Sequence, residues 1–105
     1  MAGKFKKMIE FLISRDHPSL EGHFKDNPIV PGVTLLQEIK VRIEDEWPDL
    51  IITGIIRAKF LQVLKPNQTV HVVVNQTDLG LKFTCQHQDT QIATGHFKIS
   101  KRPLE

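Results

Sequence analysis

The spacing of apolar residues along the chain changes from one segment to the next, and this change predicts the elements. Over residues 33–47 the apolar positions recur every three or four residues, which indicates an amphipathic helix. They are Val33, Leu36, Ile39, Ile43 and Trp47. Pro48 ends the pattern, because proline cannot continue a helix. On this helix we place Gln37 somewhat nearer the apolar stripe than Glu38.

The other segments have the period of two that is typical of strands. Residues 8–14 are rich in apolar side chains, and four further segments follow the helix, at residues 51–60, 69–77, 79–88 and 91–100. Short polar turns separate the four segments that follow the helix, which favours antiparallel pairing. One helix that covers one antiparallel sheet is an α+β architecture. We expect Val70, Val72 and Val74 on one face, and likewise Leu81, Phe83 and Cys85.

Size and composition favour one globular domain over residues 1–105. The chain has 40% hydrophobic and 25% charged residues, and a formal net charge of +2. This charge is too small to indicate a nucleic-acid partner. A domain of this size buries a modest fraction of its surface, so dimerisation would stabilise it. No apolar stretch is long enough for a signal peptide or a membrane span, and we expect a cytoplasmic protein.

The single cysteine and most of the histidines give no sign of a reactive site. Cys85 lies in an apolar run, where a buried and unreactive thiol is the expected state. The remaining histidines, apart from His23, have no paired spacing of the kind that metal ligands show. They are His17, His71, His87 and His96. We therefore expect neither a metal site nor a cofactor.

The segment before the helix contains the most informative motif. A histidine between glycine and phenylalanine is followed by two prolines and a second glycine, in the positions Gly22, His23, Phe24, Pro28, Pro31, Gly32 and Val33. By itself such a histidine is usually a hydrogen-bonded turn residue. In this register, however, the motif resembles that of hotdog-fold 3-hydroxyacyl-(acyl-carrier-protein) dehydratases. Phe60 and Pro66 match a second motif of that family. The resemblance implies an antiparallel sheet wrapped around one long central helix.

The resemblance also implies roles for individual residues. His23 would be the general base, a task that suits a side chain that titrates near neutral pH. The backbone N–H groups of Gly32 and Val33, at the helix start, would bind the thioester carbonyl. Phe24 and Pro31 would contribute to the substrate pocket. The family's acidic residue is replaced by Gln37.

The amide of Gln37 cannot deliver a proton, so its expected role is to orient a water molecule or the substrate hydroxyl. A shift of one residue at the helix start would bring Glu38 into the position of the acid instead. The sequence leaves these two arrangements open.

The resemblance implies a substrate, partners and two alternatives. The substrate would be an acyl thioester linked to acyl carrier protein or coenzyme A, and the protein would be a homodimer or a higher homo-oligomer with residues of both subunits in each site. A basic patch for the acidic carrier protein, or simply a solvated surface, could form from Lys4, Lys6, Lys7, Arg57, Lys59, Lys65, Lys101 and Arg102. The alternatives are a hotdog thioesterase and a non-catalytic subunit that binds acyl chains or completes a second hotdog chain.

Overall fold

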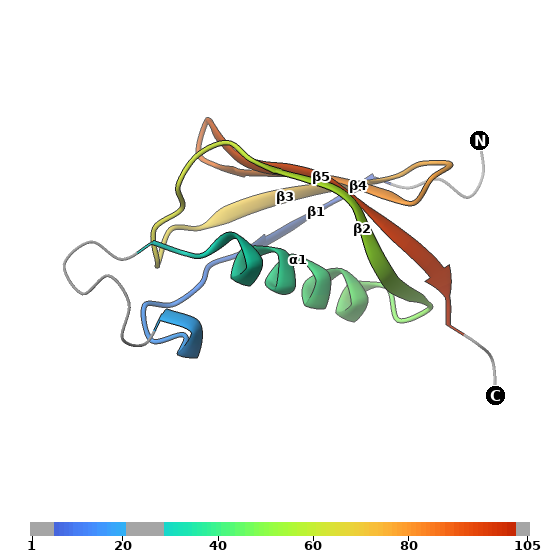
Figure 1. Ribbon diagram of the computed structural model, residues 1–105, viewed down its shortest axis with the longest axis horizontal. Helices are drawn as coiled ribbons and strands as arrows, with labels where there is room; N and C mark the ends of the chain where they lie inside the picture. Colours follow the sequence, from blue (N-terminus) through green and yellow to red (C-terminus); the bar gives the residue numbers. More distant parts are fainter. Residues whose placement is uncertain (1–5, 21–28, 103–105) are drawn as a thin grey trace.

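One helix lies against one face of a five-stranded antiparallel sheet (Figure 1). The structure is a computed structural model and describes residues 6–20 and 29–102. The elements along the chain are β1 (Lys6–Phe11), the 3-10 helix η1 (Pro18–Leu20), α1 (Gly32–Glu46), β2 (Leu50–Phe60), β3 (Val70–Gln76), β4 (Leu81–His87) and β5 (Thr90–Lys101). The strand order is β1-β3-β4-β5-β2, so β1 and β2 are the two edges of the sheet. The predicted α+β architecture is confirmed.

The strand boundaries differ from the prediction mainly in β1. This strand runs from Lys6 to Phe11 rather than over residues 8–14. It ends there because Phe11 is opposite Val70, the first residue of its neighbour β3, and no partner strand extends further.

The core lies between α1 and the facing side of the sheet. Residues Val70, Val72 and Val74 of β3 are fully buried, as are Leu81, Phe83 and Cys85 of β4. Both sets confirm the predicted alternation. The ring of Phe83 also stacks on Phe97 of β5, with 5.0 Å between the ring centroids. The buried side chains of these central strands thus form the closely packed core against which α1 packs.

The buried face of α1 differs in part from the predicted apolar stripe. Leu35, Ile39 and Ile43 are buried and form a line four residues apart, with Leu36 and Trp47 packed at its margin. Val33, however, is 74% exposed, so its place in the apolar stripe was wrong. Two residues correspond to about 200° of helix rotation, which turns Val33 away from the side of Leu35.

The same rotation separates the two candidate polar residues of α1. Gln37 is two residues from both Leu35 and Ile39, and its side chain is exposed. Glu38 is half-buried, so it lies nearer the apolar side than Gln37, the reverse of our expectation.

Strand β2 runs back along α1 and is attached to it at both ends. Near the end of the helix, a Glu44 carboxylate oxygen accepts a hydrogen bond from the Ile52 N–H at 2.9 Å. At the start of the helix, the Phe60 ring lies against Gly32. The last residue of β2 is thereby held beside the first turn of α1, where the sequence motif predicted the site.

Candidate active site

The first turn of α1 has no side-chain cap from residues 6–20 or 29–102. The N-cap residue is Pro31, in an extended conformation, and no side-chain hydrogen bond to the cap is formed among the described residues. The first helical hydrogen bond runs from the Leu35 N–H to the Pro31 carbonyl, at 3.1 Å. The N–H groups of the first turn have no intrahelical partner and carry the positive end of the helix dipole. They can therefore donate hydrogen bonds to a carbonyl or enolate oxygen.

Gly32 lies directly against an aromatic ring, a contact that the motif alone did not show. A Cβ atom added at Gly32 would lie 2.7 Å from the tip of the Phe60 ring. Any side chain at this position would displace the ring. An aromatic ring of the protein itself therefore forms one wall beside the helix start.

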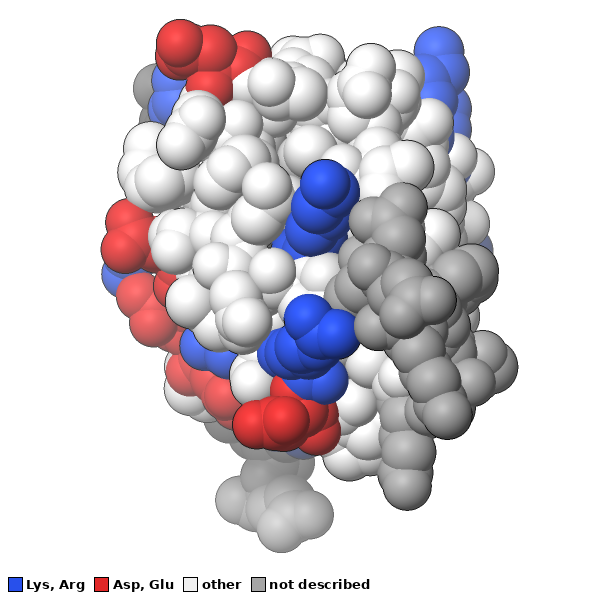
Figure 2. Space-filling view, turned by 90° about the vertical axis from the view of Figure 1, so that its left-hand side faces the viewer, with Lys and Arg blue, Asp and Glu red and all other residues white. Residues whose placement is uncertain are grey.

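A groove of about 630 Å³ opens at this point, and we call it the helix-start groove. It lies between the chain that enters α1 and the chain that leaves β2, and its lining is mostly apolar: Ile29, Val30, Pro31, Gly32, Val33, Leu35, Phe60, Leu61, Gln62, Val63, Leu64 and Ile92. Figure 2 faces this end of the molecule, where uncharged side chains form most of the visible surface. The volume falls in the range of small-molecule sites, and the lining suits a hydrocarbon chain.

Gln37 lies one helical turn beyond Val33 and lines two smaller hollows. One, of about 320 Å³, also involves Lys40 and Ile55; the other, of about 290 Å³, also involves His17 and Glu38. Val33 lines both of these hollows and the helix-start groove. The structure therefore brings Pro31, Gly32, Val33 and Gln37 to one end of the helix, whereas His23 and Phe24 lie outside the described residues.

The comparison with protein families identifies the chain. The family model of ApeI-like proteins, described as ApeI dehydratase, matches residues 3–96. The chain belongs to this ApeI-like dehydratase family. The resemblance inferred from the motif before the helix is confirmed at the level of the family and of the hotdog fold.

Curated relatives of this ApeI-like chain are 3-hydroxyacyl-(acyl-carrier-protein) dehydratases named FabZ. The protein of Thermoanaerobacter sp. (strain X514) is 29% identical over 79 residues, which cover 66% of this chain and 56% of the relative. That of Chloroflexus aggregans is 32% identical over 73 residues, with 62% and 51% covered. The chain spans about half the length of the curated relatives it matches.

Solved structures share the hotdog fold. A chain of the dehydratase heterocomplex ApeI:P from Xenorhabdus doucetiae superposes with a TM-score of 0.72 at 23% identity, covering 90% of this chain and 86% of that one. The fluoroacetyl-CoA thioesterase FlK superposes with a TM-score of 0.68 at 13% identity, covering 97% and 88%. Dehydratases and thioesterases therefore both have this architecture, and fold similarity alone does not separate the two activities.

Other reactive side chains of the ApeI-like chain have structural roles. Burial raises the pKa of the Cys85 thiol to about 12, so the nucleophilic thiolate is nearly absent at neutral pH. His71 pairs with Glu10, and the Nδ1 atom of His87 lies 2.7 Å from the carbonyl oxygen of Thr69. In the described part of the chain no three His, Cys, Asp or Glu residues gather as a metal site would require. That part also contains no helix long and apolar enough to cross a membrane.

The predicted basic residues are not gathered on one surface. Lys6 and Lys7 belong to the edge strand β1, whereas Arg57 and Lys59 belong to the opposite edge strand β2. Lys7 is paired with Glu46. Lys4 lies outside the described residues. The described members of the set thus divide into separate groups.

Part of the lining of the helix-start groove was not predicted from the sequence. Phe60 was noted only as a motif match, and residues 61–64 were given no role. The signal that could have drawn attention to them is their apolar character: Leu61 and Val63 are large hydrophobic residues that remain 41% and 60% exposed. Exposed apolar residues that lie together commonly mark a binding site.

Proposed function

We propose that this ApeI-like chain is a dehydratase of 3-hydroxyacyl thioesters that are carried by acyl carrier protein or coenzyme A during acyl-chain synthesis. His23 is the general base, and Gln37 stands where relatives have an acid. The main support is that the start of α1, which no described side chain caps, opens directly into an apolar groove. The groove suits the acyl chain, and the N–H groups of the first turn suit the thioester carbonyl.

The proposed reaction needs one proton acceptor and one oxyanion site. His23 removes a proton from the carbon next to the thioester carbonyl, and the electron pair moves onto the carbonyl oxygen. The N–H groups of the first turn of α1 stabilise this enolate. The electron pair then returns to form the carbon–carbon double bond, and the bond from the next carbon to the hydroxyl group breaks. The departing hydroxyl takes back the proton from His23, so that water and an enoyl thioester are released.

Gln37 has a positioning role in this scheme. Its exposed side chain lines two hollows together with Val33, next to the helix start. The amide can donate a hydrogen bond to the departing hydroxyl without giving up a proton. Glu38 lines one of the same hollows and is half-buried, which makes it the alternative proton donor.

The test is mass spectrometry of a 3-hydroxyacyl thioester incubated with the purified protein and with four variants. The unmodified protein should release water, and His23→Ala should slow this by about 100-fold or more, the usual contribution of a general base. His71→Ala is the matched control, because His71 pairs with Glu10 on the other edge of the sheet. Gln37→Glu should raise the rate, and Glu38→Gln should leave it unchanged unless Glu38 is the acid.

Two results would contradict the proposal. Release of the free acid would assign the protein to the thioesterases. A substrate that stays intact with the pure protein, but loses water when a second hotdog chain is added, would assign it to the non-catalytic subunits. The second alternative has support in Gln37, since a partner subunit could supply the missing carboxylate.

We further propose that two copies associate through β2. This strand is an edge of the sheet, and it leaves Ile55 53% and Ile56 48% exposed. An unpaired edge with apolar side chains is a natural site of strand pairing. Ile56→Lys should therefore shift the protein from dimer to monomer in analytical ultracentrifugation, whereas Met8→Lys, on the opposite edge, should not. A dimer that survives Ile56→Lys would place the interface elsewhere.

A further inference from the structure

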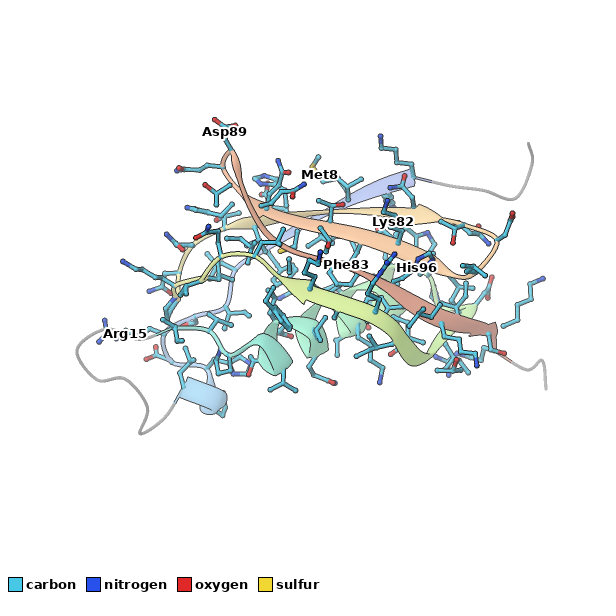
Figure 3. All side chains as sticks on the ribbon, turned by 45° about the horizontal axis from the view of Figure 1, so that its top comes forward. Met8, Arg15, Lys82, Phe83, Asp89 and His96 are labelled. Carbon is cyan, nitrogen blue, oxygen red and sulfur yellow. The ribbon has the colours of Figure 1, made fainter. Side chains whose placement is uncertain are left out.

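The face of the sheet that points away from α1 has a groove of its own. This outer-face groove has a volume of about 300 Å³ and crosses strands β2, β5 and β4; its lining residues are Arg57, Lys59, Lys82, Thr84, Gln91, Thr94, Gly95 and His96. Figure 3 shows Lys82 and His96 on the neighbouring strands β4 and β5. In contrast to the helix-start groove, this lining is polar and basic.

The strand register places the cations on both sides of the groove. His96 of β5 is opposite Arg57 of β2 on one side and Lys82 of β4 on the other. In the next row, Thr94 is opposite Lys59 and Thr84. Neighbouring strands are about 4.8 Å apart, so β2 and β4 are separated by roughly 10 Å. The long side chains of Arg57 and Lys82 can reach toward one small ligand from both sides.

The positive charge of this groove is not neutralised by its own lining, which contains no Asp or Glu. Two side-chain pairs in the described ranges, Lys7 with Glu46 and His71 with Glu10, include no residue of this groove. Arg57 and Lys59 of β2 and Lys82 of β4 thus face the groove with no acidic residue in its lining. A bound anion would supply the opposite charge.

The neutral residues of the groove add hydrogen-bond donors between the cations. The hydroxyl groups of Thr84 and Thr94 and the amide of Gln91 can each donate to an oxygen atom. The His96 ring is buried, and a hydrogen bond between its Nε2 atom and the Thr77 hydroxyl, 2.7 Å apart, holds it in place. The centre of the site is therefore held in place, whereas the cations at its sides are exposed and can adjust to a ligand.

We propose that the outer-face groove binds the phosphate or diphosphate group of a ligand. Guanidinium groups match phosphate oxygens through paired hydrogen bonds, and a lysine adds a compact positive charge. The groove lies on the opposite face of the sheet from α1, and the inference does not rest on the dehydratase activity. The phosphate could be free diphosphate or the phosphate groups of coenzyme A, since both present the same chemistry.

The test is isothermal titration calorimetry at low salt with two probes, sodium diphosphate and coenzyme A. The unmodified protein should bind at least diphosphate saturably. The double variant Arg57→Ala/Lys82→Ala should bind it at least about tenfold more weakly, because it loses two charge-assisted contacts. The matched control is Lys65→Ala/Lys101→Ala, which removes the same charge outside the groove and should bind as before. Circular dichroism would verify that each variant is folded.

The outcomes separate the two sources of phosphate and can overturn the proposal. If the double variant weakens both probes, the site accepts the phosphates of coenzyme A. If it weakens diphosphate alone, the ligand of this groove carries a phosphate other than that of coenzyme A. Absence of saturable diphosphate binding, or equal binding by the double variant and the unmodified protein, would show that the groove is not a phosphate site. Amide shifts of Thr84 and Thr94 in nuclear magnetic resonance spectra should follow the same titration.

Discussion

The packing around Gly95 of β5 gives the sharpest structural prediction. A Cβ atom at this position would lie 2.5 Å from a ring carbon of Phe83 and 2.6 Å from the backbone oxygen of Arg57. The first distance is about 0.9 Å shorter than ordinary van der Waals contact. Neither neighbour can move easily, because the Phe83 ring is fully buried against Phe97 and the oxygen belongs to the backbone of β2.

Gly95→Ala should therefore be strongly destabilising. Overpacking of a core costs about 1–3 kcal/mol, and two immobile neighbours place this variant near the upper end. With a urea dependence of about 1–3 kcal/mol per molar, the unfolding midpoint should fall by roughly 1–3 M. Equilibrium urea denaturation, followed by circular dichroism, measures this shift.

The matched control is Gly54→Ala in β2. The nearest atom to a Cβ at Gly54 is the Lys98 Cβ, at 4.0 Å, so the methyl group fits. This variant should be as stable as the unmodified protein, or more stable by up to about 1 kcal/mol, because alanine restricts the unfolded chain. If Gly95→Ala and Gly54→Ala had the same midpoint, the close packing of Gly95 against Phe83 would be refuted.

Three further predictions concern the core and its links. Because burial raises the pKa of the Cys85 thiol from 9.0 to about 12, the native protein should not react with a thiol reagent at pH 8. The stability that the neutral thiol contributes is complete below pH 9 and is lost as the pH rises to 12. Urea denaturation should show this loss in the unmodified protein but not in Cys85→Ala. Ile39→Ala should lower the free energy of unfolding by about 2–5 kcal/mol, since Ile39 is fully buried. Val41→Ala, at a partly exposed position of the same helix, should lower it far less. Equal losses in the two variants would contradict the observed buried face of α1. Glu44→Ala removes the acceptor of the Ile52 N–H and should cost about 1–3 kcal/mol in thermal denaturation, and an unchanged midpoint would show that water replaces the carboxylate.

The sequence predicted the strands well because one side of the sheet is buried. Val70, Val72 and Val74 alternate with residues on the other face, and a period of two is enough to identify such a strand. The helix was harder, since one residue turns the face by about 100°. Val33 fits an apolar spacing but points away from the core, and Gln37 and Glu38 exchanged their expected places.

The grooves could not be predicted from local patterns. Phe60 contacts Gly32 across 28 positions of the chain, and this contact depends on the path of β2 along α1. The outer-face groove requires the register of three strands, of which β2 and β5 are neighbours in the sheet but not in the sequence. Arg57 and Lys82 lie in the same row across the sheet only because each of them is opposite His96. Sequence spacing alone contains no such information.

The most direct test of the dehydratase assignment uses the reverse reaction. An enoyl thioester is incubated with the protein in water labelled with heavy oxygen, and the products are analysed by mass spectrometry. The account predicts that the label enters the hydroxyl group of an intact 3-hydroxyacyl thioester, and that His23→Ala abolishes this. Label in the carboxylate of a released free acid would identify a thioesterase and contradict the account.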